Sequence, residues 1–229
     1  MIIEQVVAQY FGTNCWIFAP SANSECFLVD PGIAIPNLVP DIKEVLDRHN
    51  LKPIATLVTH GHLDHTFSVV PVDETYGVAT YIHPKDRPYL ANPYGILTPG
   101  GPLEALLAEL GKTEFAEPKD VRELSDGTIF ELLGMRIKAL HGPGHTPGST
   151  LFQVDDEYLI SGDVLFQNSI GKTSLPQGSI TDMKKTIEKV ILPLPDDLIV
   201  LPGHGPETTI GRERKNNDFL QQSFLRSAD

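Results

Sequence analysis

The sequence predicts a single layered α/β domain, in which helices cover sheets built from short strands. Short apolar runs rich in β-branched residues, such as 54–58, alternate with segments whose apolar residues recur at helical spacing, such as 38–46. Turns that contain Gly, Pro or Asn separate these runs. A length of 229 residues supports one substantial core, and no repeat, low-complexity tract or linker divides the chain. We therefore expect residues 1–229 to form one domain.

Composition and charge narrow the class of function. Hydrophobic residues make up 41% of the chain and charged residues 21%, a balance typical of folded globular proteins. The net charge of -12 opposes binding to nucleic acid or to anionic membranes. The first residues lack the pattern of a secretory signal, and no apolar run approaches the roughly 18 residues of a membrane span. We therefore expect a cytoplasmic protein that acts on a small molecule, and the oligomeric state stays open.

The N-terminal part of the chain predicts a mixed sheet with two helices. Strands are expected at 2–8, 14–18, 26–29, 54–58 and 79–83. Helices are expected at 38–46 and from about Thr66. Cys15 and Cys26 fall in neighbouring strands, and in the cytoplasm two buried reduced thiols are more common than a disulfide.

The segment 84–118 differs from the rest in composition. Pro and Gly residues interrupt it, and it contains one short amphipathic helix, expected at 103–110. Such a segment serves either as a lid or substrate wall, or as an excursion without function. The sequence favours neither interpretation and assigns no role to any single residue of this segment.

The C-terminal part predicts a second set of strands. The runs 129–133 and 136–140 flank a Gly-Met turn and indicate a hairpin. Further strands are expected at 150–154, 158–161 and 198–201. A helix is expected at 183–191.

The segment 60–65, which follows the strand 54–58, concentrates groups that can bind metal ions. It supplies four potential ligands within six residues: His60, His62, Asp64 and His65. Imidazole nitrogens and carboxylate oxygens suit Zn, Fe or Mn. Four ligands exceed what one open catalytic metal ordinarily takes from so short a segment. The segment therefore indicates two metals, or one metal and a nearby base.

Three later strands end in the same way, in Gly-containing loops that carry a ligand-type side chain. These residues are His145, Asp163 and His204. Side chains at the ends of several strands can converge on one rim of a sheet. The remaining histidines lack this context, so His49 and His83 are expected in structural roles, and His141 in a loop hydrogen bond.

Together these motifs resemble those of the metallo-β-lactamase superfamily, over about residues 14–217. The resemblance implies a four-layer αβ/βα sandwich. It implies that one metal is bound by His60, His62 and His145. It implies that the other is bound by Asp64, His65 and His204. Asp163 would bridge the two divalent ions, for which zinc is the expected metal and iron or manganese are alternatives.

The chemistry of such a pair is consistent with hydrolysis. Two cations about 3.5–4 Å apart can share a hydroxide and lower the pKa of that water from 15.7 to about 7. Asp163 would offset part of the positive charge and fix the spacing of the ions, and Asp64 would orient its metal and the hydroxide. We therefore expect Asp64 and Asp163 to take part in catalysis as well as in metal binding.

Within the superfamily, the segments 162–172 and 202–211 resemble the glyoxalase II branch, whose members hydrolyse S-acylglutathione thioesters such as lactoylglutathione. This resemblance implies that Lys172 contacts the glutathione carboxylate. Two departures leave the thiol carrier open: the chain stops at Asp229, before the helical domain of the longer enzymes, and Ser174 replaces their tyrosine.

Other activities share this scaffold. A mononuclear iron persulfide dioxygenase uses many of the same ligands, although Pro147 after the His-Thr pair is more typical of hydrolases. A lactonase, another ester hydrolase or a β-lactamase would differ only in its pocket walls, and the lack of a secretory signal pattern disfavours a periplasmic antibiotic hydrolase. The run 171–173 lacks the preceding glycine of a phosphate-binding loop, because Phe166 stands there. The basic residues 212–215 are expected on a solvated helix.

Overall fold

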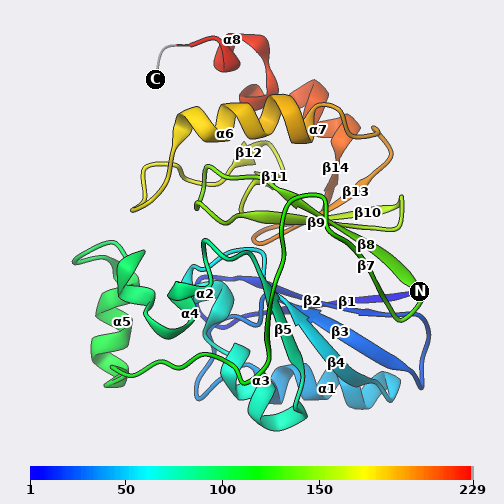
Figure 1. The fold of residues 1–229 in the computed structure, drawn as a ribbon, viewed down its shortest axis with the longest axis vertical. Helices are drawn as coiled ribbons and strands as arrows, with labels where there is room; N and C mark the ends of the chain where they lie inside the picture. Colours follow the sequence, from blue (N-terminus) through cyan, green and yellow to red (C-terminus); the bar gives the residue numbers. More distant parts are fainter. Residues whose placement is uncertain (228–229) are drawn as a thin grey trace.

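The computed structural model describes residues 1–227, which form two six-stranded sheets packed face to face with helices on both outer sides (Figure 1). The first sheet consists of β1 (Ile2–Val7), β2 (Asn14–Ala19), β3 (Glu25–Val29), β4 (Lys52–Leu57), β5 (Ala79–Ile82) and β6 (Val121–Glu123), in that order. The second has the order β14 (Thr208–Thr209), β13 (Ile199–Pro202), β10 (Tyr158–Gly162), β9 (Thr150–Val154), β8 (Met135–His141), β7 (Ile129–Leu132). The expected four-layer αβ/βα sandwich is confirmed.

The helices form the two outer layers and part of the segment that joins β5 to β6 within the first sheet. The helices beside the first sheet are α1 (Val39–His49), α2 (Leu63–Thr66) and α3 (Val69–Tyr76). The helices beside the second sheet are α6 (Ile180–Thr186), the π-helical turn η2 (Ile187–Ile191), α7 (Ile210–Asn216), the 3-10 turn η3 (Asp218–Leu220) and α8 (Gln222–Leu225). The segment between β5 and β6 carries α4 (Pro88–Ala91), the 3-10 turn η1 (Pro93–Gly95) and α5 (Pro102–Leu110). A two-stranded ribbon, β11 (Leu165–Phe166) and β12 (Ser169–Ile170), follows β10.

Three apolar layers hold this sandwich together. Phe18 and Phe27 stack at 5.0 Å in the layer between the two sheets. Their strand neighbours Ile17 and Leu28 point the other way, because successive side chains of a strand alternate, and pack in the cluster that includes α1. Met183 belongs to a third cluster, which joins α6 to the second sheet. Since both faces of the central strands are covered, β2 is buried along its whole length.

Most predicted elements are found within two or three residues of their expected bounds. The helix expected from Thr66 is instead two helices, α2 and α3, which break at Phe67 and Ser68. The sequence patterns do not predict β6, β11, β12 and β14. These strands have only two or three residues each, which is too few for periodicity to reveal them.

The two cysteines are free and buried, as expected. Burial raises the pKa of both thiols well above the ordinary value, that of Cys26 to about 12. Both side chains therefore remain neutral at physiological pH and contribute to the core as small apolar groups. None of the helices within residues 1–227 is long and apolar enough to cross a membrane.

Candidate metal centre

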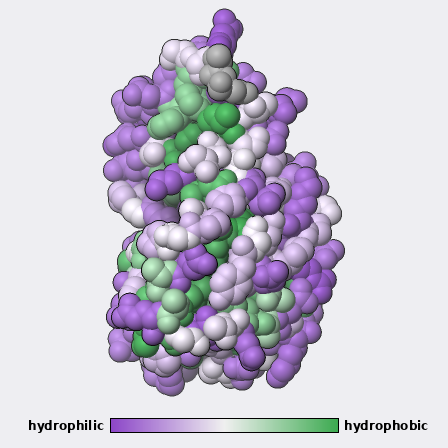
Figure 2. Space-filling model, turned by 90° about the vertical axis from the view of Figure 1, so that its left-hand side faces the viewer, coloured by the Kyte–Doolittle hydropathy of each residue, from purple (hydrophilic) through white to green (hydrophobic). Residues whose placement is uncertain are grey.

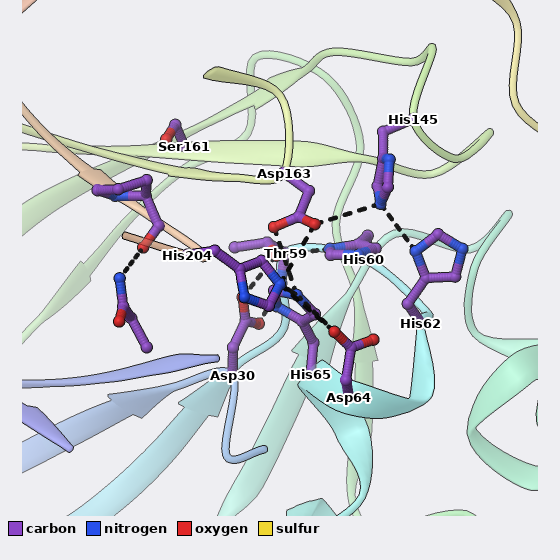
Figure 3. Close-up of polar contacts among 12 residues, drawn as sticks. Asp30, Thr59, His60, His62, Asp64, His65, His145, Ser161, Asp163 and His204 are labelled. Atoms are coloured by element: carbon purple, nitrogen blue, oxygen red, sulfur yellow. Dashed lines mark hydrogen bonds and ion pairs between the residues drawn. The ribbon is translucent and has the colours of Figure 1, made fainter. Parts of the chain in front are cut away.

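The predicted ligands meet at one edge of the sandwich, where both sheets deliver loops to the same point (Figure 3). The loop after β4 and the start of α2 carry four of them. Three loops of the second sheet, after β8, β10 and β13, carry one each. The seven side chains brought together are His60, His62, Asp64, His65, His145, Asp163 and His204.

The first group consists of His60, His62 and His145, which are all buried and whose ligand atoms lie within 4.8 Å of one another. Nδ1 of His62 lies 2.8 Å from Nε2 of His145. Nδ1 of His145 is 2.8 Å from the carbonyl oxygen of Lys172, to which it can only donate, so Nε2 of His145 keeps its lone pair. This arrangement offers nitrogen lone pairs to a shared centre.

The second group consists of Asp64, His65 and His204. Nε2 of His204 lies 3.4 Å from Oδ2 of Asp64 and 3.2 Å from Nε2 of His65. Asp163 stands between the two groups. Its Oδ2 is 3.5 Å from Nε2 of both His145 and His204. Figure 3 shows the carboxylate of Asp163 lying among these side chains. A carboxylate in that position can serve both groups at once.

The chemistry of the cluster fits a pair of divalent cations. Nε2 of His60 is buried and makes no hydrogen bond, which is costly unless another partner is present. Burial lowers the pKa of His62 to about 3 and that of His145 to about 4, so both rings are neutral at pH 7 and can donate lone pairs to a metal.

The second group attracts positive charge. Burial by itself would lower the pKa of His65, but the carboxylates of Asp163, Asp64 and Asp30 outweigh it and raise that pKa to about 10. Asp64 shows the opposite balance: burial would raise its pKa, but the charge of His65 and the hydrogen bond from His204 hold it well below the usual range. A proton on His65 therefore supplies, in the metal-free chain, the positive charge that a cation would bring.

A buried aspartate that the sequence analysis did not single out, Asp30 at the end of β3, orients the second group. Its carboxylate accepts hydrogen bonds from the backbone N–H and the hydroxyl of Thr59, at 2.8 and 2.6 Å. It lies 2.9 Å from Nδ1 of His65. Asp30 follows an apolar strand just as the predicted ligands do, and that signal could have identified it.

Asp86, another buried aspartate, orients the first group. Its Oδ2 accepts hydrogen bonds from the N–H of Gly61 at 2.8 Å and from Oγ1 of Thr146 at 2.5 Å, and its Oδ1 accepts one from the N–H of Gly148 at 2.7 Å. One carboxylate thus ties the loop that carries His60 and His62 to the loop that follows His145. Asp86 belongs to the segment 84–118, in which the sequence assigned no role to any residue.

Two glycines allow the loops to approach this closely. A Cβ on Gly203 would lie 2.6 Å from Cε1 of His65 and would also collide with the carboxylate of Asp163. A Cβ on Gly171 would meet the carbonyl oxygen of Asp163 and lie 2.9 Å from Nδ1 of His145. The glycine of the run 171–173 therefore serves close packing beside the site rather than phosphate binding.

The N-terminal sheet also holds the loop that carries His204. The side-chain amide of Asn14 donates to the carbonyl oxygens of Pro202 and Gly205, at 3.0 and 2.8 Å. The indole N–H of Trp16 donates to Pro202 as well, at 3.0 Å. These contacts join residues nearly two hundred positions apart, and nothing in the local sequence pattern indicates them.

A cavity of about 630 Å³ opens above the cluster. Five of the predicted ligands line it: His62, Asp64, His145, Asp163 and His204. Apolar residues from 96–103 form part of its wall, so the structure places the segment 84–118 beside the site. Lys172 also lines the cavity, as the prediction of a substrate contact requires. A volume of this size is typical of small-molecule sites.

The other histidines and the basic run lie outside the cluster. His49 pairs with Glu4 at 2.6 Å, and His141 contacts the carbonyl oxygen of Pro147 at 2.8 Å, the loop hydrogen bond that the sequence predicts. His83 stacks on His141 with ring centroids 4.2 Å apart. The basic run is not simply solvated, because Arg214 pairs with Asp196 and also donates to backbone carbonyl oxygens.

Comparison with protein families and sequences gives a consistent result. Residues 9–204 match the metallo-beta-lactamase superfamily. An uncharacterised protein of Mycobacterium tuberculosis is 40% identical over 229 residues, which cover 96% of this chain and 98% of the relative. The hydroxyacylglutathione hydrolase GloC of Haemophilus influenzae is 33% identical over 228 residues, which cover 96% of this chain and 98% of GloC.

Two solved structures support the same assignment. BLEG-1, a B3 metallo-beta-lactamase, superposes with a TM-score of 0.81 and 32% identity, over 96% of this chain and 99% of BLEG-1. TTHA1623 in a di-iron-bound form superposes with a TM-score of 0.75 and 30% identity, over 94% of this chain and 99% of that protein. With His and Asp clusters suited to divalent metals, the chain belongs to the metallo-beta-lactamase superfamily and is a metal-dependent hydrolase.

Proposed function

We propose that the protein hydrolyses thioesters of the S-acylglutathione type at a centre of two divalent metals. The observation that carries this proposal is the position of Asp163, whose carboxylate lies 3.3 to 3.5 Å from ligand nitrogens of both groups at the base of an open cavity. The identity to GloC, a hydroxyacylglutathione hydrolase, over nearly the full length of both chains supports the thioester as substrate.

The side chains divide between the two ions as the family resemblance implies. His60, His62 and His145 would hold one, and Asp64, His65 and His204 the other, with Asp163 between them. When bound, two divalent cations supply Lewis acidity toward a carbonyl oxygen and lower the pKa of water toward neutrality. Zinc suits this donor set, and iron is supported by the di-iron form of TTHA1623.

The remaining steps depend on residues of the chain itself. Lys172 at the cavity would bind a carboxylate of the thiol carrier. Asp64 faces the cavity with a side chain that is 17% exposed and a pKa well below the usual range, since the charge of His65 and the hydrogen bond from His204 outweigh burial. A carboxylate so weakly basic would orient the attacking water by accepting a hydrogen bond rather than remove its proton permanently.

The leaving group favours a thioester over an amide. As water adds to the carbonyl carbon, the bond from carbon to sulfur breaks and the sulfur departs as a thiolate. The corresponding thiol has a pKa of about 8.5, so the leaving group needs little protonation. Among residues 1–227, the cavity lining contains no titratable side chain besides the clustered ligands and Lys172. Such a site suits a leaving group that departs without a strong general acid.

The similarity to BLEG-1 supports β-lactam hydrolysis as a second candidate. In that reaction the leaving nitrogen must be protonated. A site without a strong general acid should therefore hydrolyse a β-lactam more slowly than a thioester. The test measures hydrolysis of S-D-lactoylglutathione, other S-acylglutathiones, a lactone and a chromogenic cephalosporin by protein of known metal content. Oxygen uptake with glutathione persulfide is measured in parallel.

The proposal expects thioester turnover with about two metals per chain, and slower or no turnover of the lactone and the cephalosporin. Faster hydrolysis of the cephalosporin would favour the second candidate. Oxygen consumption by protein with one iron, without hydrolysis, would identify a persulfide dioxygenase and overturn the proposal.

A further inference from the structure

Above the ligands the cavity is lined mainly by apolar side chains, and one lysine is the charged exception. One side is formed by 96–103, which includes the first residues of α5, and contributes Ile96, Leu97, Thr98, Gly101, Pro102 and Leu103. The ribbon β11–β12 and the residues after it add the apolar side chains of Phe166, Ile170 and Leu175, and here Lys172 supplies the one cationic side chain of the described lining. Thr98 is the only residue of the 96–103 side with a polar side chain.

The segment 96–103 packs beside the metal centre. Leu97 is 7% exposed and belongs to one cluster with Leu63 and Leu107. Leu63 stands between His62 and Asp64 in sequence, so this wall packs directly against the segment that carries the ligands. Leu103 is partly buried against the same cluster and also lines the cavity. The wall therefore has a defined position relative to the ligands.

Apolar residues also come to the surface on this side of the molecule, among hydrophilic ones (Figure 2). In a chain of net charge -12, Lys172 is the one cationic side chain of the described lining that could attract an anionic substrate group. An anionic thiol carrier matches the side with Lys172. The segment 96–103 offers a polar acyl group only the hydroxyl of Thr98 as a side-chain hydrogen-bond partner, and a hydroxyl that leaves water for such a wall loses free energy.

We propose that the wall 96–103 is a binding site for apolar acyl groups, so that the protein prefers thioesters of aliphatic acids to lactoyl thioesters. This inference rests on the proposed thioester hydrolysis and adds to it the chemical class of the acyl group. Leu97, Pro102 and Leu103 would contact the acyl chain, and Lys172 would bind the carrier elsewhere in the same cavity.

The first test uses the unmodified, metal-loaded protein with S-acetyl-, S-butyryl-, S-hexanoyl- and S-D-lactoylglutathione. We expect kcat/KM to rise about fourfold for each added methylene, which corresponds to about 0.8 kcal/mol of apolar burial. The hexanoyl thioester should exceed the lactoyl thioester by at least about tenfold. A flat or falling series, or preference for the lactoyl group, would overturn the inference while leaving thioester hydrolysis intact. If none of the four thioesters is hydrolysed, the proposed function fails and the inference fails with it.

The second test measures binding without turnover. S-hexylglutathione and S-methylglutathione are titrated calorimetrically into the full chain, with and without zinc. The hexyl compound should bind more tightly and with a more negative heat-capacity change, the mark of apolar burial. Equal affinities would contradict an apolar site.

A matched pair of variants tests whether the acyl group binds to the wall 96–103. Leu103→Asn should flatten the dependence of kcat/KM and of affinity on chain length, because it puts an amide where the acyl chain would lie. Leu110→Asn, at the end of the same helix and outside the cavity lining, should keep the dependence of the unmodified protein. Both variants are compared at equal metal content. Thermal unfolding curves check that each variant is as stable as the unmodified protein. If the chain-length dependence is unchanged in Leu103→Asn, the wall 96–103 is not the acyl site.

Discussion

The carboxylate of Asp30 lies 2.9 Å from Nδ1 of His65 and accepts its hydrogen. Both side chains are almost fully buried, at 2% and 0% exposed. Because Nδ1 is occupied in this way, Nε2 of His65 is the nitrogen that faces His204, at 3.2 Å. A second carboxylate, that of Asp86, joins the loops of the other group. Each group of ligands thus has a buried aspartate behind it.

Replacing Asp30 with Asn should weaken the metal held by Asp64, His65 and His204. The amide has one accepting oxygen where the carboxylate has two, so it cannot accept all three hydrogen bonds, two from Thr59 and one from His65, and the ring of His65 loses its fixed orientation. We expect about a 10- to 100-fold loss of affinity for one of the two metals, measured by competition with a chromogenic chelator. Asp47→Asn, on the surface of α1, is the control. Unchanged affinity for both metals would show that Asp30 does not orient the ligand.

Replacing Asp86 with Asn should affect the other metal, because Asp86 ties together the loops of His60, His62 and His145. It introduces an N–H₂ group where a backbone N–H already points, a change that costs about 1–3 kcal/mol of stability. Cobalt substitution reports on the two sites separately, and its visible spectrum should change differently in Asp86→Asn and Asp30→Asn. Identical spectra in the two variants would contradict this division of roles.

Asp163 and His60 should be indispensable for metal loading. We expect Asp163→Ala or His60→Ala to abolish turnover and to reduce the metal content together, while the fold remains, because each removes a ligand without opening the apolar layers. Metal analysis and circular dichroism check both expectations. Full activity in either variant would overturn the assignment of the centre.

Lys172→Gln should act on binding and not on the chemical step. The exposed position limits the contribution of one charge, so we expect KM for S-lactoylglutathione to rise about fivefold, equivalent to about 1 kcal/mol, with little change in kcat. Lys185→Gln, on α6 and outside the cavity lining, should leave KM unchanged. A loss confined to kcat would show that Lys172 does not bind the carrier.

The pair His83 and His141 should make the fold sensitive to acid. Burial, and then the neighbouring His141, lower the pKa of His83 from 6.5 to about 4. The unfolded chain takes up this proton near pH 6.5 and the folded chain only near pH 4. The stability that depends on neutral His83 is therefore complete above pH 6.5 and decreases as the pH falls from 6.5 through 4.

A His83→Phe variant tests this sign, because the phenyl ring keeps the stack but cannot bind a proton. Urea unfolding of both proteins, after removal of metal by a chelator, is compared at pH 7 and pH 5. The unmodified protein should lose more stability between these values than the variant. An equal or larger loss in the variant would show that His83 does not contribute to acid sensitivity.

Strand ends account for most of what the sequence could predict. Apolar runs such as 54–58 and 198–201 mark strands, and the polar residues after these strands fall at one edge of the sandwich. The sequence alone therefore predicts that His60 and His204 lie close together at that edge. Asp30 obeys the same rule and was missed because the residues after it read as a simple turn.

Other parts of the site depend on contacts that only the folded chain makes. Asp86 acts through backbone N–H groups, which leave no pattern in the sequence, and Asn14 and Trp16 reach a loop nearly two hundred residues away. The position of the wall 96–103 depends on the packing of Leu97 against Leu63, which Pro- and Gly-rich composition could not indicate.

The most direct test of the central claim is hydrolysis of S-acylglutathiones by protein titrated from metal-free to two zinc ions per chain. We expect turnover to require bound metal, to reach its maximum near two equivalents and to disappear on chelation. Protein that binds two equivalents yet hydrolyses no S-acylglutathione would contradict it.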